Sequence, residues 1–219
     1  MNTMTKFAAA AASLVAFAAA APAAQATVYL GLDNGGGIVT VDSGALGAFY
    51  ANAFGTFEFT VDSGTAGTFP QLLASTSHTN NNAGGDAGTL DVYATVDGLT
   101  GSIPKHFLSS FTSNVMPAGW SVRLRTYVDT GNGLFGGTLL ADNTYTGLDS
   151  EDFHNGFVGG AGPYSVTARY TIVAPTQGDT LATISLGAVP EPGTWALMIM
   201  GFGGAGAMLR SRRKDLVSA

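Results

Sequence analysis

Short runs in which apolar and polar residues alternate are the feature that most restricts the fold of this chain. The run 57–62, with the sequence FEFTVD, alternates strictly. A period of two places one set of side chains on each face of a β-strand. Similar runs occupy 90–96, 122–128, 164–173 and 180–186, and the segments between them are rich in Gly, Asn, Ser and Asp. The pattern predicts an all-β fold.

The segment 27–189 is long enough for one domain of ordinary size. We expect about six to nine strands, packed as two antiparallel sheets in a β-sandwich or jelly roll. The stretch from Ser75 to Gly88 contains three consecutive Asn residues and a Gly pair. Its polarity predicts a long exposed loop.

Charge and cysteine content exclude several classes of protein. Between residues 27 and 189 there are four basic and thirteen acidic residues, so phosphate backbones would repel the domain and nucleic-acid binding is disfavoured. The chain has no Cys, which excludes disulfides, thiol catalysis, Cys-ligated zinc and a lipid-modified N-terminal Cys. Stability must therefore come from burial.

The first 26 residues follow the order of a secretory signal peptide. Lys6 provides the positive charge, an apolar run extends from Phe7 to Ala21, and Ala24 and Ala26 mark a small-residue cleavage site. This order predicts a signal helix at 1–26 and a mature protein that begins at Thr27. An Ala-rich core helix is the alternative, because Ala is the best helix former.

The C-terminal residues combine three parts. Pro190, Glu191 and Pro192 predict an extended segment, because prolines disfavour helix. The apolar run from Trp195 to Leu209 predicts a single hydrophobic helix that spans about 22 Å, less than a hydrocarbon core of ~30 Å, so crossing would require bilayer thinning or snorkelling ends. A basic cluster follows, formed by Arg210, Arg212, Arg213 and Lys214. Its charge predicts that the tail end is cytoplasmic and the domain external.

Residues 190–214 resemble the PEP-CTERM sorting signal of Gram-negative bacteria that make extracellular polysaccharide, in the variant with Trp195 and Ala196 after the Pro-Glu-Pro motif. The resemblance implies that a membrane enzyme, an exosortase, recognises Pro190, Glu191 and Pro192 and cuts nearby. The chain would be anchored in the inner membrane before processing and lie at the cell surface or outside the cell afterwards, with 215–219 as the cytoplasmic end. A bare anchor and a buried core helix are the alternatives.

Candidate metal ligands are few. The densest acidic cluster consists of Asp149, Glu151 and Asp152, and oxygen-rich loops can hold Ca²⁺. No EF-hand spacing is present, and a solvated acidic loop is the other interpretation. The histidines, His78, His106 and His154, have none of the zinc-protease spacings. The sequence predicts no cofactor, with Ca²⁺ as a weak candidate.

Three functions remain open for the domain. The first is a non-enzymatic surface or matrix protein of an exopolysaccharide layer or biofilm, an association that rests on the resemblance. The second is a carbohydrate-binding module, whose sugar would stack on exposed aromatic residues such as Tyr50, Trp120, Tyr145 or Tyr164. The third is a polysaccharide hydrolase with a carboxylate pair such as Glu58 and Glu151. No Gly-x-Ser-x-Gly elbow supports an esterase.

Overall fold

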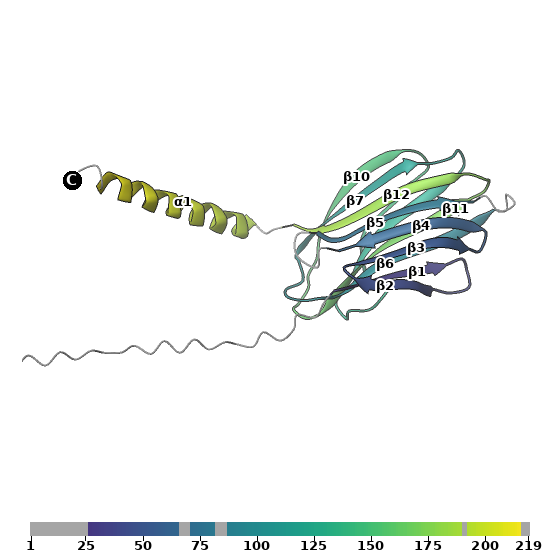
Figure 1. Ribbon diagram of the computed structural model, residues 1–219, viewed down its shortest axis with the longest axis horizontal. Helices are drawn as coiled ribbons and strands as arrows, with labels where there is room; N and C mark the ends of the chain where they lie inside the picture. The colour runs from purple at the N-terminus through teal and green to yellow at the C-terminus, as the bar shows by residue number, and fades with distance from the viewer. Residues whose placement is uncertain (1–25, 66–70, 82–86, 190–191, 216–219) are drawn as a thin grey trace, which may run out of the picture.

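The protein folds into two stacked antiparallel sheets, followed by one helix (Figure 1). The structure, a computed structural model, describes residues 26–65, 71–81, 87–189 and 192–215. Sheet A contains, in spatial order, β2 (Val39–Ala45), β1 (Thr27–Asp33), β6 (Gly88–Leu99), β11 (Tyr164–Ala174), β8 (Ser121–Asp129) and β9 (Thr138–Tyr145). Sheet B contains β10 (Asp149–Gly156), β7 (His106–Val115), β12 (Asp179–Ala188), β5 (Gln71–Asn80), β4 (Phe57–Gly64) and β3 (Gly47–Phe54).

The predicted β-sandwich is confirmed, and it has more strands than expected. Each of the five alternating runs lies within a strand, namely β4, β6, β8, β11 and β12. The twelve described strands exceed the predicted number, because strands such as β3 and β10 carry small or charged residues that weaken the alternation. Pairing with a neighbouring strand, which the sequence pattern does not reveal, holds these segments extended.

The core lies between the inner faces of the two sheets. Large apolar side chains from both sheets are fully buried there, including Leu30, Leu124, Phe107, Phe111 and Ile184. Burying one such side chain contributes about 1.5–3 kcal/mol relative to leaving it exposed. The alternation seen in the sequence therefore accounts for the core.

The predicted exposed loop from Ser75 to Gly88 is wrong for its first part. Residues 75–80 belong to β5, where Ser75, Ser77 and Thr79 are buried on the inner face of sheet B. Hydroxyl groups can be buried when they are hydrogen-bonded: Ser75 Oγ accepts a bond of 2.8 Å from Ser63 Oγ, and the hydroxyls of Ser77 and Thr79 lie 3.2 Å apart. Residues 82–86 lie outside the described ranges.

Side-chain caps protect three of the sheet edges. Asn52 on β3, Asn143 on β9 and Asp149 on β10 each accept a hydrogen bond from the backbone N–H of the following residue, at 3.0, 2.8 and 2.8 Å. The three strands are edge strands. Unpaired edge groups invite pairing with other chains, and local Asx bonds of this kind occupy them. The sandwich therefore presents partly capped edges.

Candidate functional sites: the tail and the outer faces of the sheets

The tail begins where the last strand ends. β12 closes at Ala188, whose side chain is buried in the core, and Val189 N donates a hydrogen bond of 2.9 Å to His106 O. Pro190 and Glu191 lie outside the described residues. Pro192 was predicted to be extended, and this is wrong: it is the first residue of helix α1 (Pro192–Asp215). A proline fits the first helical turn because its missing N–H would have no intrahelical partner there.

Helix α1 is longer than the apolar run that predicted it. Its 24 residues extend through the basic cluster to Asp215, a length of about 36 Å. The described large side chains from Leu197 to Met200, and Phe202, are exposed, and the helix extends away from the sandwich (Figure 1). Within the described residues, no helix combines the length and apolar character needed to cross a membrane. The predicted transmembrane character is thus not confirmed.

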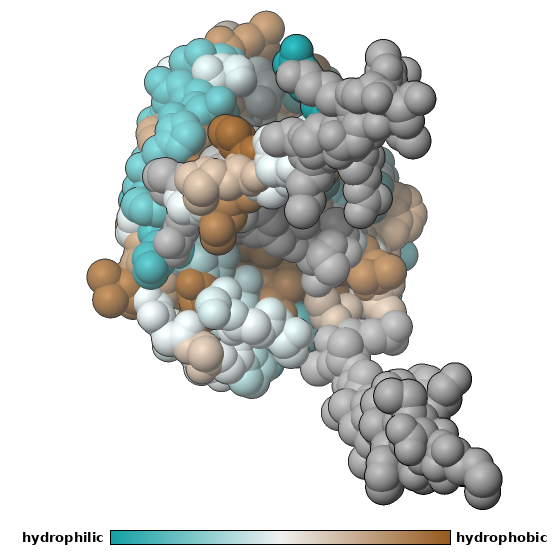
Figure 2. All heavy atoms as spheres, turned by 90° about the vertical axis from the view of Figure 1, so that its left-hand side faces the viewer, coloured by the Kyte–Doolittle hydropathy of each residue, from teal (hydrophilic) through white to brown (hydrophobic). Residues whose placement is uncertain are grey.

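Seen from the side toward which the tail extends, hydrophobic and hydrophilic residues are interspersed (Figure 2). Ala196 and Arg210 of the tail are exposed, whereas the side chains of Trp195, Arg212, Arg213 and Lys214 are outside the description. At the other end of the chain, Ala24 also falls outside it. Ala26 is buried beside the core, and β1 begins directly after it at Thr27. The predicted cleavage point and the first strand thus coincide in sequence.

The predicted acidic cluster is spread over both sides of β10. Neighbouring residues of a strand point to opposite faces, which separates Glu151 from Asp152. Glu151 accepts hydrogen bonds from Asn143 Nδ2 and from the hydroxyl of Tyr145, the latter at 3.5 Å. Among the described residues no group of three His, Asp or Glu side chains could hold a metal ion. The structure thus does not gather a Ca²⁺ site from these residues.

The aromatic residues proposed for sugar stacking are mostly buried, which corrects that expectation. Trp120, Tyr145 and Tyr164 belong to the core, each less than 5% exposed. Tyr50 is half-buried and packs on Phe59, with ring centroids 5.3 Å apart. The Trp120 indole N–H donates a hydrogen bond of 3.3 Å to Thr176 Oγ1. These rings contribute to packing, because strand alternation directs them inward.

The proposed carboxylate pair is also separated. Glu58 lies on β4 and Glu151 on β10, four strand positions apart in sheet B. At ~4.8 Å per strand the two backbones are about 19 Å apart, whereas paired glycosidase carboxyl groups lie about 5–9.5 Å apart. The histidines are spread over three strands as well: His78 lies on β5, with its Nε2 3.4 Å from Asp179 Oδ2, whereas His106 lies on β7 and His154 on β10.

The outer face of sheet A carries a network of paired charges that the sequence did not reveal. Arg169 donates to both oxygens of Asp91, at 3.1 and 2.9 Å, and its guanidinium lies 4.9 Å from the centre of the Tyr93 ring. Arg123 donates to both oxygens of Asp142, and this hydrogen bond lowers the pKa of the Asp142 carboxyl. Three of the four basic residues of 27–189 are therefore gathered on β8 and β11.

The outer face of sheet B is different, because its register aligns small side chains in one row across all six strands. This small-residue row consists of Gly47, Gly64, Ala74, Ser185, Ser110 and Asp152, each paired with the next. A second row, here called the hydroxyl row, runs beside it and consists of Thr76, Thr183, Thr112 and Ser150, continued by Asp62 and Phe49. Because the side chains of this row are small, the outer surface of sheet B lies lower along the row than along the larger side chains beside it.

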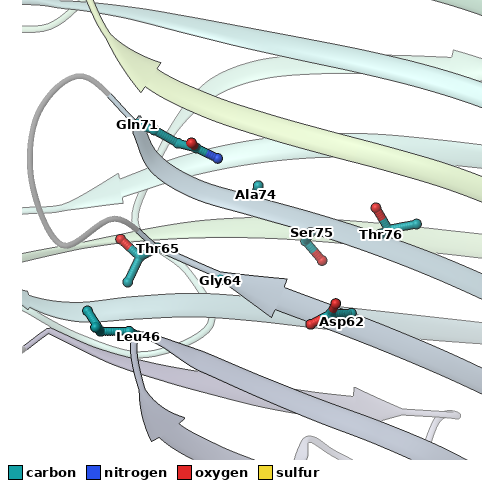
Figure 3. Close-up of a pocket in the computed structure, with 8 residues that line it drawn as sticks. All are labelled: Leu46, Asp62, Gly64, Thr65, Gln71, Ala74, Ser75 and Thr76. Atoms are coloured by element: carbon teal, nitrogen blue, oxygen red, sulfur yellow. The ribbon is translucent and has the colours of Figure 1, made fainter.

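Two hollows lie along the small-residue row, and Gln71 lines both of them. The first has a volume of about 470 Å³, and Figure 3 shows Gly64 and Ala74 on adjacent strands, with Gln71 and Thr65 to one side and Asp62 and Thr76 to the other. The second, of about 450 Å³, is lined by residues of β5, β12, β7 and β10, including Gln71, Ser185, Leu108 and His154. We call these two neighbouring hollows together the groove.

A third hollow, of about 410 Å³, lies on the same face over β3, β4 and β5. Its lining includes Ala51, Thr60 and His78. No sequence motif indicated any of these hollows. Each is formed by residues from several strands, so only the strand register brings its lining together.

Residues 188–214 match the PEP-CTERM protein-sorting motif. The family resemblance drawn from the sequence is thereby confirmed for the tail, and of the sandwich the match includes only Ala188, the last residue of β12. Proteins that carry this signal are exported and sorted through it, and this chain carries it. No curated protein matches the chain in sequence.

Several solved structures align with part of this chain at low similarity. The arabinose-bound α-L-arabinofuranosidase MgGH51 aligns with 64% of this chain at 15% identity and a TM-score of 0.33, over 24% of its own length. TmCBM61, in complex with β-1,4-galactotriose, aligns with 64% of this chain and 92% of its own at 10% identity and a TM-score of 0.33. The mannan-binding module TmCBM27 aligns with 65% of this chain and 86% of its own at 14% identity and a TM-score of 0.29. With TM-scores below 0.5, no ligand or activity is transferred.

Proposed function

We propose that this chain is an exported, non-enzymatic surface or matrix protein whose sandwich is separated from its tail by a membrane processing enzyme. One observation carries the proposal: the sorting motif begins at residue 188, the same residue at which β12 and the core end. A cut within or after the Pro-Glu-Pro segment would therefore leave every described strand in place. The sandwich would remain folded outside the cell.

The parts of the tail have separable roles in this proposal. The basic cluster holds the end of the tail on the cytoplasmic side, because flanking positive charge sets membrane orientation. The helix is anchored in the inner membrane, where the bilayer thins locally around it. It presents Pro190 and Glu191 at the external surface of that membrane. An exosortase-like enzyme then cuts near these residues.

The test is an immunoblot of membrane and secreted fractions from the native host, with antibody against the sandwich. Glu191→Ala and Pro192→Ala are expected to give a protein that is exported and membrane-bound but uncut, whereas Glu58→Ala, an exposed glutamate of β4, serves as the control and should be processed normally. Replacing Arg210, Arg212, Arg213 and Lys214 by Gln should disturb retention or orientation. Normal cleavage of the Glu191 and Pro192 variants would contradict the proposal.

A further inference from the structure

We infer that the groove on sheet B binds a neutral, hydroxyl-rich polymer, a polysaccharide chain, laid across the strands. The floor of the groove is the small-residue row, in which Gly64, Ala74, Ser185 and Ser110 occupy four consecutive strands. One bank is the adjacent hydroxyl row, of which Asp62 and Thr76 line the first hollow while Thr183, Thr112 and Ser150 follow in the strand register. The other bank is formed by Gln71, Leu108 and His154, which are linked through Gly187 in the strand register.

The dimensions fit an extended chain. The small-residue row crosses six strands, and five spacings of ~4.8 Å give a length of about 24 Å. The register shift at Leu186/Gly187 opposes Gln71 to Gly187, a residue without a side chain. Gly187 therefore adds no bulk beside Gln71, the residue that lines both hollows, and the small-residue row runs from β4 to β7 without a large side chain.

The polar groups along the groove suit sugar hydroxyls. In the hydroxyl row, the side chains of Thr76 and Thr183 lie 3.2 Å apart, and those of Thr112 and Ser150 lie 3.3 Å apart. A hydroxyl can donate one bond and accept two, so each such pair retains free capacity. Within the described part of the chain, Gln71, Ser110 and Ser185 form no side-chain hydrogen bond that would compete with a ligand.

Charge and backbone chemistry favour a neutral glycan over two other polymers. The described residues of the floor and banks include no Lys or Arg, and the carboxyl groups of Asp62 and Asp152 would repel an acidic chain. An extended peptide needs partners for its own N–H and C=O groups, but the backbone groups of these inner strands are used in the ladder. A neutral glycan brings hydroxyls for the banks and C–H surface for Ala74 and Leu108.

This inference rests on the proposed function in one respect, since an exported domain meets such chains outside the cell. The test is electrophoresis of the full chain, purified in detergent micelles, through native gels. Separate gels contain a neutral glucan, a neutral galactomannan, an acidic polyuronate, gelatin as an extended polypeptide, or no polymer. Retardation that depends on polymer concentration gives the dissociation constant.

Variants that fill the floor make the test specific. Ala74→Gln and Ser185→Gln place a longer side chain in the groove, and Thr144→Gln on the exposed outer face of sheet A is the matched control. We expect retardation by at least one neutral polymer, with a dissociation constant raised about tenfold in both floor variants and unchanged in the control. Unchanged melting temperatures would show that both floor variants are folded.

Three results would overturn the inference: no retardation by either neutral polymer, retardation only by polyuronate or gelatin, or equal retardation of wild type and both floor variants. A chain that binds the neutral polymer but is not processed in its host would contradict the proposed function alone. A processed chain without polymer binding would contradict the groove alone.

Discussion

The hydroxyl of Tyr170 on β11 in sheet A donates a hydrogen bond of 2.5 Å to the backbone carbonyl of Ser75 on β5 in sheet B. The same hydroxyl accepts a bond of 3.2 Å from the backbone N–H of Ile184, the ladder partner of Ser75. Tyr170 is fully buried, and burial raises the pKa of its phenol well above the ordinary value. One side chain thus joins the two sheets through the backbones of β5 and β12.

We expect Tyr170→Phe to lower the free energy of unfolding by about 1–3 kcal/mol, because it removes two buried hydrogen bonds and leaves backbone groups without that partner. Urea denaturation followed by circular dichroism measures the change. Tyr127→Phe is the control, since Tyr127 is half-buried on the outer face of sheet A, and its effect should stay within about 0.5 kcal/mol. Equal losses in both variants would contradict the role given to Tyr170.

Stability should fall in alkaline solution. Burial is the main cause that raises the pKa of Tyr93, Tyr145, Tyr164 and Tyr170. Below pH ~10 these phenols are neutral in both states, so their contribution is fully present; above it the unfolded chain loses protons that the folded protein keeps. Each group then removes up to about 1.4 kcal/mol per pH unit.

Urea unfolding at pH 9, 10 and 11 measures this loss, and ultraviolet absorbance of tyrosinate should rise together with unfolding. Tyr170→Phe should show a shallower decline between pH 10 and 11 than the wild type. A protein equally stable at pH 9 and 11 would disprove the linkage.

The two Arg–Asp pairs of sheet A should differ in their contribution. Asp91 accepts from Arg169 and from the hydroxyl of Thr171, and the Arg169 side chain is only 26% exposed, against 47% for Arg123 in the other pair. We expect Asp91→Asn to lower the free energy of unfolding by about 1.5–3 kcal/mol and Asp142→Asn to lower it clearly less, because solvent screens the more exposed pair. Chemical denaturation of both variants at low and high salt provides the comparison.

The sequence predicted the fold class because apolar alternation is a local property. It failed at Ser75 and Thr79, where buried hydroxyls satisfy one another and Tyr170 reaches across from the other sheet. From a single sequence, a polar strand of this kind cannot be distinguished from a loop. Its burial depends on partners that are far away in the chain.

The candidate sites divide in the same way. The tail was found from sequence because its motif is contiguous, and Pro192 was misjudged only because a proline can begin a helix as well as prevent one. The groove could not be found, since the alignment of Gly64 with Ala74 and Ser185 depends on strand order, and that of Gln71 with Gly187 on a bulge at Leu186/Gly187. In sheet B, only β3, β4 and β5 lie side by side in the order in which they follow one another in the sequence.

Calcium should have no measurable effect on stability. Glu151 is engaged by Asn143 and Tyr145, and Asp152 points to the opposite face of β10, so in the described part of the chain no three acidic or His side chains come together. A site with a dissociation constant of about 10 µM would add about 2.7 kcal/mol at 1 mM Ca²⁺, equivalent to roughly 5–11 °C in melting temperature. We expect a difference below about 1 °C between 1 mM Ca²⁺ and chelator. A shift of several degrees that Asp152→Asn abolishes, while Asp179→Asn on β12 does not, would require a Ca²⁺ site on β10.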